Sequence, residues 1–385
     1  MAGPLPPTTS GEGFEDDDRE RTLTRLLCAR IQAEGPLRSD AFMEVVLYHP
    51  QFGYYTHEDA APVGPEGDFY TVPRLTPVFA RTLARRIRRA YDEAGQPPDF
   101  RLVEVGAGDG SLGVELVRAL AEIDTRSREW TYVIVERGRG QSDLAARRMR
   151  SEVPLALSAV HTQGSLAADG PFSGVVLGNE LLDALPARRL VRHGDAWFDL
   201  VVEWTQEGFH WVRAGTEMTL TDPPLPPADE GAILEWVPLA DAFLRELADH
   251  LHHGVALFLD YGAEEEELVK ARSGGTLQAL RGHRSVSETL ATPGRADLST
   301  FVNWTRWRAA ARRAGLKERS WIRQVNALEE WGVEDTAREW VEEAFTDEER
   351  VRRHLAMKNL FFGFENFWVW ELVPGTSTGL TANVT

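Results

Sequence analysis

A glycine-rich stretch, VEVGAGDG at residues 103–110, has the pattern of a buried strand that runs into a tight turn before a helix. Glycine lets the backbone turn tightly and approach a ligand closely, and the N-terminus of the helix that follows attracts negative charge. The stretch also matches the dinucleotide fingerprint when it is read as Gly108-x-Gly110-x-x-Gly113, although this pattern alone is weak evidence for NAD. The glycines therefore predict a nucleotide cofactor, with a tight turn that holds no ligand as the alternative.

Two carboxylates bear on which nucleotide the loop would bind. Glu104 lies two residues before the first glycine, where it suits the ammonium group of S-adenosylmethionine and not a pyrophosphate. Glu136 ends the next expected strand, where an acid can hold the ribose hydroxyls of either adenosine cofactor, although acids at strand ends are also common without a ligand. S-adenosylmethionine is thus the better fit, and its loop is expected to consist of Gly106, Gly108 and Gly110.

A second segment with polar side chains, GNELLDALP at residues 178–186, follows the fourth expected strand. Ligands of open α/β sheets bind beyond the carboxyl ends of the strands, so Asn179 and Glu180 are expected to face the cofactor pocket. Asp183 lies about one helical turn beyond Glu180 and can share the same side, with helix capping or surface charge as its alternative role. The segment would place two carboxylates and an amide beside a sulfonium methyl group.

Methyl transfer displaces a sulfonium and needs a nucleophile held in line, about 3 Å from the methyl carbon, in a dry and preorganised pocket. For an arginine acceptor, carboxylates can hold the guanidinium in a bidentate manner and aim one of its nitrogens. Glu180 and Asp183 are the candidates for that task, and Asp260, at the end of the fifth expected strand, is a third. His283 is the candidate for a group that titrates near neutral pH, although a lone loop histidine is more often structural.

The elements that would position these residues alternate between strands and helices after residue 98. Short apolar strands are expected at residues 101–105, 130–135, 155–161, 174–177 and 255–259. Segments with helical periodicity separate these strands. This alternation indicates a parallel sheet covered on both faces and hence an α/β fold of the doubly wound, Rossmann-like kind. Residues 190–220 alternate instead like inserted antiparallel strands.

Three parts are expected along the chain. Residues 1–20 have the composition of a disordered acidic tail, 21–98 that of an N-terminal helical cap, and 99–385 that of the core, with insertions at about 187–235 and 262–303. The tail lacks both the apolar segment of a secretory signal and the Arg-rich, acid-poor composition of a mitochondrial transit peptide. A cytoplasmic location is therefore expected.

Composition narrows the range of partners. The chain of 385 residues carries 60 Asp and Glu against 42 Lys and Arg, a formal net charge of −18, which argues against a nucleic-acid partner. No apolar run approaches the roughly 18 residues of a membrane span. The single cysteine, Cys28, fits neither a disulfide nor a zinc pattern, so no metal is expected. The partners expected are a protein or small-molecule acceptor, and a homodimer is left open.

Six motifs follow one another along the chain: FMEVVLYHPQFGYYT, GDFYTVPRLTPVF, VEVGAGDGSL, NELLDALPARRL, the strand end Asp260-Tyr261-Gly262, and TLQALRGHR followed by PGRADLSTFVNW. In this order they resemble the MidA-like S-adenosylmethionine-dependent methyltransferases, a family that includes a mitochondrial complex I assembly factor that methylates a protein arginine. The similarity runs from about Arg21 to the C-terminus. It implies a class I methyltransferase fold with an N-terminal helical cap and inserted antiparallel strands.

The resemblance also implies roles for individual residues. It places Glu136 on the ribose, counts Asn179 among the cofactor residues and puts Glu180 and Asp183 at the methyl-transfer site. A further loop is expected to fold over the cofactor, and its residues are Gly67, Asp68, Phe69 and Thr71.

The chain departs from the family pattern on the acceptor side. Val72 and Arg74 replace a serine and a glutamate, and Phe301 and Asn303 replace a histidine and an aspartate. Fold and cofactor are therefore expected to carry over better than the acceptor. The leading expectation is transfer to an arginine nitrogen of a protein partner. The alternatives are O- or N-methylation of a small molecule, and a noncatalytic assembly protein that retains the cofactor fold.

Overall fold

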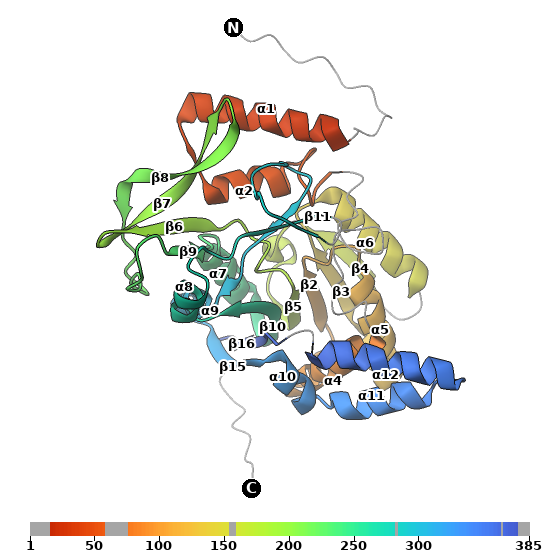
Figure 1. Ribbon diagram of the computed structural model, residues 1–385. Helices are drawn as coiled ribbons and strands as arrows, with labels where there is room; N and C mark the ends of the chain where they lie inside the picture. The colour runs from red at the N-terminus through yellow and green to blue at the C-terminus, as the bar shows by residue number, and fades with distance from the viewer. Residues whose placement is uncertain (1–15, 58–75, 154–158, 282–283, 363–364, 376–385) are drawn as a thin grey trace.

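The computed structural model describes residues 16–57, 76–153, 159–281, 284–362 and 365–375. An eight-stranded sheet lies at its centre in the order β15–β16–β10–β5–β2–β3–β4, with β14 beside β10 (Figure 1). The strands are β2 Arg101–Val105, β3 Thr131–Val135, β4 Ala159–Gln163, β5 Phe172–Asn179, β10 Leu251–Ala263, β14 Val302–Asn303, β15 Lys317–Arg323 and β16 Phe367–Val373. The five adjacent strands β4, β3, β2, β5 and β10 run parallel, whereas β16 is antiparallel to both of its neighbours. The expected α/β fold is confirmed, and β15 and β16 extend the sheet beyond the predicted strands.

Helices cover both faces of this sheet, because successive residues of a strand point to opposite sides. Leu102 and Tyr132 pack on the face covered by α4 (Pro77–Glu93), α5 (Ser111–Ile123), α6 (Arg139–Glu152), α10 (Gln324–Glu330) and α11 (Val333–Glu342). Val103 and Val133 pack on the other face, which is covered by α7 (Ala240–His250) and α9 (Trp304–Arg313). Helices α1 (Asp16–Glu34) and α2 (Ser39–Tyr48) belong to the same apolar cluster but pack on each other and on the inserted antiparallel strands. Two short 3-10 turns, η1 (Thr125–Glu129) and η2 (Leu166–Asp169), complete the connections.

Helix α4 was expected in the N-terminal cap, but it packs on the central sheet. Thr76 caps its first turn by accepting a hydrogen bond from the N–H of Val78 at 3.2 Å, and Pro77 takes the first helical position, which needs no N–H donor. The buried guanidinium of Arg86 donates two hydrogen bonds to Glu371 of β16, at 2.7 and 2.8 Å. The helix therefore belongs to the core, and the core begins before residue 99.

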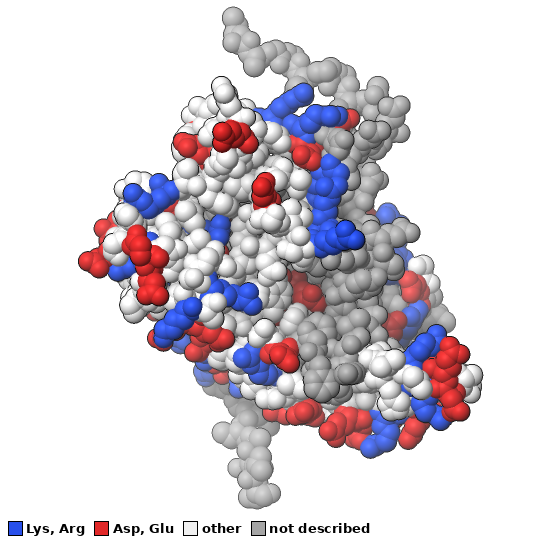
Figure 2. Space-filling model, viewed as in Figure 1, with Lys and Arg blue, Asp and Glu red and all other residues white. Residues whose placement is uncertain are grey.

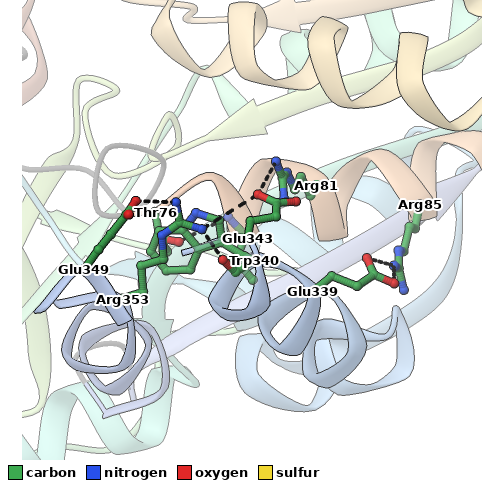
Figure 3. Close-up of polar contacts among 9 residues, drawn as sticks. Thr76, Arg81, Arg85, Glu339, Trp340, Glu343, Glu349 and Arg353 are labelled. Carbon is green, nitrogen blue, oxygen red and sulfur yellow. Dashed lines mark hydrogen bonds and ion pairs between the residues drawn. The ribbon is translucent and has the colours of Figure 1, made fainter. Parts of the chain in front are cut away.

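Helix α11 lies against α4 through pairs of arginine and glutamate, and α12 (Asp347–Phe362) packs on α11 in turn (Figure 3). Arg81 pairs with Glu343 at 2.8 Å, and Arg85 pairs with Glu339 at 3.1 Å. Both pairs are partly exposed, so each contributes little to stability. They fix the register of α11 along α4 while the buried apolar side chains hold the layer together.

The chain between β5 and β10 forms a separate antiparallel sheet in the order β1–β7–β6–β9, with β8 beside β7. Its strands are β1 Leu37–Arg38, β6 Arg188–His193, β7 Ala196–Thr205, β8 Gly208–Met218 and β9 Ile233–Trp236. The inserted antiparallel strands are thus confirmed. Strand β1 comes from the N-terminal segment and pairs with β7, so that α1 and α2 pack beside the insertion (Figure 1).

The second insertion carries α8 (Glu265–Ala271) and a small sheet in the order β12–β11–β13. Its strands are β11 Gln278–Arg281, β12 Arg284–Val286 and β13 Asp297–Ser299. At the other end of the chain, α1 begins at Asp16. The predicted tail of residues 1–20 is therefore too long, because its last five residues already belong to this helix.

Candidate active site

A cavity of about 420 Å³ lies at the carboxyl ends of β2, β3 and β5, where ligands of such sheets bind. Its walls come from the glycine loop after β2, the turn after β5, the turn after α2, helix α7 and strand β13. Seven of the residues singled out from the sequence line it: Glu104, Gly106, Gly108, Glu136, Asn179, Glu180 and Asp183. The structure thus brings the two predicted motifs together in one cavity.

The glycine loop has a backbone that only glycine adopts without strain. Gly106, Gly108 and Gly110 have φ angles of +72°, +56° and +77°, in the left-handed region that side chains disfavour. A Cβ on Gly106 would lie 2.8 Å from Cδ1 of Leu181, whose side chain packs between the loop and the turn after β5. Glycine is therefore required here both by the backbone angle and by the space available.

Glu136 lies at the end of β3 and reaches the glycine loop. Its Oε1 accepts a hydrogen bond from the N–H of Gly108 at 2.8 Å. Burial raises the pKa of this carboxyl to about 7. The position is the one expected for a carboxylate that holds ribose hydroxyls.

Glu104 is buried beneath the loop at 3% exposure. The hydroxyl of Tyr132 donates a hydrogen bond to its Oε2. The absence of a side chain at Gly113 makes this contact possible, since a Cβ there would lie 2.4 Å from the Tyr132 oxygen. Burial, with the charge of Glu136 as a smaller cause, raises the pKa of Glu104 to about 7. A cationic group in the cavity would stabilise the ionised form of this carboxyl.

The turn after β5 presents Asn179, Glu180 and Asp183 to the cavity. Glu180 has a φ angle of +50°, which is unusual for a residue with a side chain. The Nδ2 of Asn179 donates a hydrogen bond to Oε1 of Glu180 at 3.3 Å. The backbone of this turn is thus held in a strained conformation, as is frequent at functional sites.

Asp260 lies behind this turn and is not among the described residues that line the cavity. Its Oδ2 accepts hydrogen bonds from the N–H groups of Leu181, Leu182 and Asp183, at 3.1, 2.7 and 3.3 Å. Its Oδ1 accepts one from the N–H of Tyr261 at 2.9 Å. The expected place at the methyl-transfer site is therefore corrected: the carboxylate binds the backbone of the turn that carries the site.

Two buried oxygens of the cavity lining have no hydrogen-bond partner among the described residues, Oδ1 of Asn179 and Oδ1 of Asp183. The side chain of Asp183 is 7% exposed, and burial raises its pKa to about 6. A buried acceptor without a donor is unfavourable, so these atoms fit a ligand that supplies N–H or ammonium donors. The residues present thus fit a cationic cofactor and a donor-rich acceptor.

Three lining residues were given no role from the sequence: Tyr48, Tyr55 and Asp297. The hydroxyl of Tyr55 donates a hydrogen bond to Oδ1 of Asp297, and the hydroxyl of Tyr48 donates one to the carbonyl of Ala184 at 3.0 Å. The two tyrosine rings stack with their centres 5.5 Å apart. The signal that could have found them lay in the motifs FMEVVLYHPQFGYYT and PGRADLS, which were quoted only for their resemblance.

Other predicted residues lie outside the described residues or away from the cavity. Those outside are Gly67, Asp68, Phe69, Thr71, Val72, Arg74 and His283. Asn303 is buried and caps α9, since its Oδ1 accepts a hydrogen bond from the N–H of Arg306 at 3.3 Å. Phe301 packs against Tyr261, with ring centres 5.0 Å apart. These two departures from the family pattern therefore lie outside the described cavity lining.

Carboxylates dominate the lining. The described lining has seven carboxylates and a single arginine, Arg137. The carboxylates are Glu104, Asp109, Glu136, Glu180, Asp183, Glu246 and Asp297. A cavity with one sign of charge and low-dielectric walls attracts ions of the other sign. This electrostatic field favours cationic ligands.

A sheet of this order, a glycine loop after its first strand and a carboxylate at the end of the next strand define a class I S-adenosylmethionine-dependent methyltransferase. Residues 82–321 match the model of a family of S-adenosyl-L-methionine-dependent methyltransferases. The chain belongs to this family, and its cofactor is S-adenosylmethionine.

Curated relatives and a solved structure agree with this assignment. The Xenopus tropicalis protein arginine methyltransferase NDUFAF7, mitochondrial, is 27% identical over 317 residues, which cover 76% of this chain and 71% of the relative. The Mus musculus protein of the same name is 26% identical over 79% of this chain and 72% of the relative. A crystal structure of a Burkholderia thailandensis protein bound to S-adenosyl-homocysteine superposes with a TM-score of 0.82 at 28% identity, over 97% of each chain.

Every helix in the described part of the chain is too short or too polar to span a bilayer. Within the same ranges, no three His, Cys, Asp or Glu residues are grouped so as to hold a metal ion. The curated relatives are named mitochondrial, so the cytoplasmic location stays a prediction.

Proposed function

We propose that this methyltransferase transfers the methyl group to a nitrogen of an arginine side chain in a protein partner. The observation that carries the proposal is a cavity whose charged lining consists of seven carboxylates, the buried Asp183 among them, and one arginine. A guanidinium has five N–H donors and a permanent positive charge, which match such a site. The relatives named protein arginine methyltransferase support the same acceptor.

The bound cofactor supplies an electrophilic methyl group on a positively charged sulfur. Glu104 lies where it can pair with the ammonium group of that cofactor, Glu136 where it can bind the ribose, and Gly106, Gly108 and Gly110 form the loop that the cofactor approaches. Asn179 offers its unpartnered oxygen on the same side. These residues bind and orient; none of them needs to form a covalent bond.

Glu180 and Asp183 orient the acceptor. Each carboxylate can accept N–H groups of the guanidinium, which aims one nitrogen at the methyl carbon. Methylation of a guanidinium releases one proton, and a carboxylate must be ionised to receive it or to pass it to water. Burial raises the pKa of Asp183 to about 6, so it is ionised at neutral pH and closer to the working pH than an ordinary aspartate.

The experiment is an incubation of the purified protein and tritiated S-adenosylmethionine with proteins of a cell lysate. The protein fraction is then hydrolysed and analysed for methylated amino acids. We expect label in methylarginine, with a rate that falls at least 100-fold in Asp183→Asn while S-adenosylhomocysteine binding stays within twofold. Asp195→Asn, at an exposed carboxylate on the β6–β7 hairpin, is the matched control and should keep the wild-type rate.

Two results would contradict the proposal. Label confined to the low-mass fraction would make the protein a small-molecule methyltransferase. Label in protein but in another amino acid would keep a protein acceptor and exclude arginine.

A further inference from the structure

We infer that Asp297, held by Tyr55, is a second carboxylate arm of the acceptor subsite and makes it selective for a planar guanidinium over an ammonium group. The inference rests on the proposed function and deepens it. It assigns the acceptor wall to two segments that lie far from the cofactor motifs in the sequence: the turn after α2 and the strand β13.

Asp297 is placed in the cavity by the second insertion. It begins β13, is 3% exposed and lines the cavity. The end of the same strand is joined to the turn after β5, because the N–H of Thr300 donates a hydrogen bond to the carbonyl of Asp183 at 2.9 Å. The two carboxylates therefore lie on adjoining backbone segments of one wall.

Tyr55 is placed beside Asp297 by a turn that folds back on α2. The N–H groups of Tyr54 and Tyr55 donate hydrogen bonds to the carbonyls of Val46 and Leu47, each at 2.9 Å. Gly53 permits this fold, since a Cβ there would lie 2.5 Å from the nitrogen of His49. The turn brings the hydroxyl of Tyr55 onto Oδ1 of Asp297.

Both carboxylates face the same pair of tyrosines. The charges of Asp183 and Asp297 each add to burial in raising the pKa of Tyr55 and of Tyr48. The charge of Glu136 acts on Tyr48 as well. The charges of these carboxylates thus act on the tyrosine pair, and Tyr55 contacts Asp297 directly.

This arrangement suits a flat, delocalised cation. A guanidinium can donate hydrogen bonds to one carboxylate at each of two edges while its face rests against an aromatic ring. An ammonium group is a compact point charge whose donors do not lie in one plane. Asp297 touches the acceptor in this scheme, whereas Tyr55 is a positioning residue that fixes the orientation of the carboxylate.

The test compares wild type with Asp297→Asn and Tyr55→Phe. Methylarginine formation in the lysate assay is measured in the presence of N-acetyl-argininamide or N-acetyl-lysinamide as competitor, and S-adenosylhomocysteine binding is measured by calorimetry. For wild type, we expect the arginine compound to inhibit at least fivefold more strongly than the lysine compound. In Asp297→Asn the rate should fall at least tenfold and the preference should disappear, with cofactor affinity within twofold.

Tyr55→Phe separates positioning from a purely structural role. It removes only the hydroxyl, so we expect a smaller fall in rate, about threefold, together with a weakened preference for the arginine compound. A wild-type rate and preference in Asp297→Asn would overturn the inference while leaving the proposed function intact. Loss of S-adenosylhomocysteine binding in Asp297→Asn would also overturn it, because the carboxylate would then support the fold. A wild type that forms no methylarginine would overturn the proposed function, and the inference with it.

Discussion

Replacing Glu104 with glutamine is expected to raise the stability of the protein at pH 8 and to change it little at pH 5. The carboxyl is 3% exposed, and its pKa in the folded protein is raised from 4.5 to about 7, mainly by burial. A carboxyl with a raised pKa binds its proton more tightly in the folded state, so its contribution to stability falls as the pH rises from 4.5 to 7. At about 1.4 kcal/mol per unit, the ionised carboxylate costs about 3 kcal/mol at pH 8 and about 1 kcal/mol or less at pH 5.

Glutamine keeps the shape of the side chain, and its oxygen can still accept the hydrogen bond from Tyr132. It carries no charge that burial would penalise. Urea unfolding of wild type and Glu104→Gln at the two pH values measures the difference, with a gain of about 3 kcal/mol expected at pH 8. Glu122→Gln, at an exposed position of helix α5, is the control and should show no gain that grows with pH.

The same variant tests the cofactor role of Glu104. The ammonium group of S-adenosylhomocysteine would lose its carboxylate partner, so we expect calorimetry to show affinity reduced at least tenfold. Unfolding curves that coincide at pH 8 would refute the electrostatic reasoning. A gain in stability with unchanged cofactor affinity would keep that reasoning and remove Glu104 from the cofactor site.

Three other perturbations have defined outcomes. Gly106→Val would place a Cβ 2.8 Å from the Leu181 side chain at a φ of +72°. Calorimetry should therefore show that the affinity for S-adenosylhomocysteine falls at least 100-fold, while the circular dichroism spectrum stays unchanged. Wild-type affinity would mean that the cofactor avoids this loop. Asp260→Ala would leave the N–H groups of the turn after β5 unpaired, and chemical denaturation should show a loss of about 3 kcal/mol or more; an unchanged midpoint would mean that water satisfies them. The rate of methyl transfer should rise with pH through about 6 as Asp183 ionises, and a rate that is flat from pH 5 to 8 would exclude this group from the rate-determining step.

The strands of the sheet were predictable where short-range pattern alone decides them. Residues 101–105 were expected as a strand and form β2 with the same bounds. Residues 255–259 were expected as a strand, but β10 runs from Leu251 to Ala263. Its extra length comes from pairing with three other strands, β5, β14 and β16. Pairing of this kind depends on neighbours that are remote in sequence, so the ends of a strand cannot be read from its own residues.

The last strands of the sheet illustrate the same limit. The segment FWVWELV is rich in apolar and aromatic residues, and its Trp370 is fully buried. Their pattern does not say that β16 enters the sheet antiparallel between β10 and β15. Apolar residues predict burial, whereas the order of strands depends on which edge of the sheet is still unpaired when the chain returns to it.

The two halves of the cavity differed in how far they could be predicted. The cofactor half is built from one strand, one turn and one helix that are contiguous in sequence, so its glycines and Glu104 form a local pattern. The acceptor half depends on a hydrogen bond between Tyr55 and Asp297, which are 242 residues apart. Tyr55 lies in a turn and Asp297 in a strand of three residues, and both segments are too short for periodicity to predict them. Only the packing of the N-terminal segment against the second insertion brings them to the same wall.

Asp260 shows why a position at a strand end is insufficient evidence for a catalytic role. The rule that ligands bind beyond the carboxyl ends of parallel strands selected Glu180 and Asp260, and Asp183 was added because it lies about one helical turn beyond Glu180. It identifies an edge of the sheet but not the direction of a side chain. Asp260 is turned toward the N–H groups of residues 181–183, which donate hydrogen bonds to its Oδ2, whereas Asp183 lines the cavity. The distribution of backbone donors therefore decides which of two neighbouring aspartates is available to a substrate and which one holds the turn that presents it.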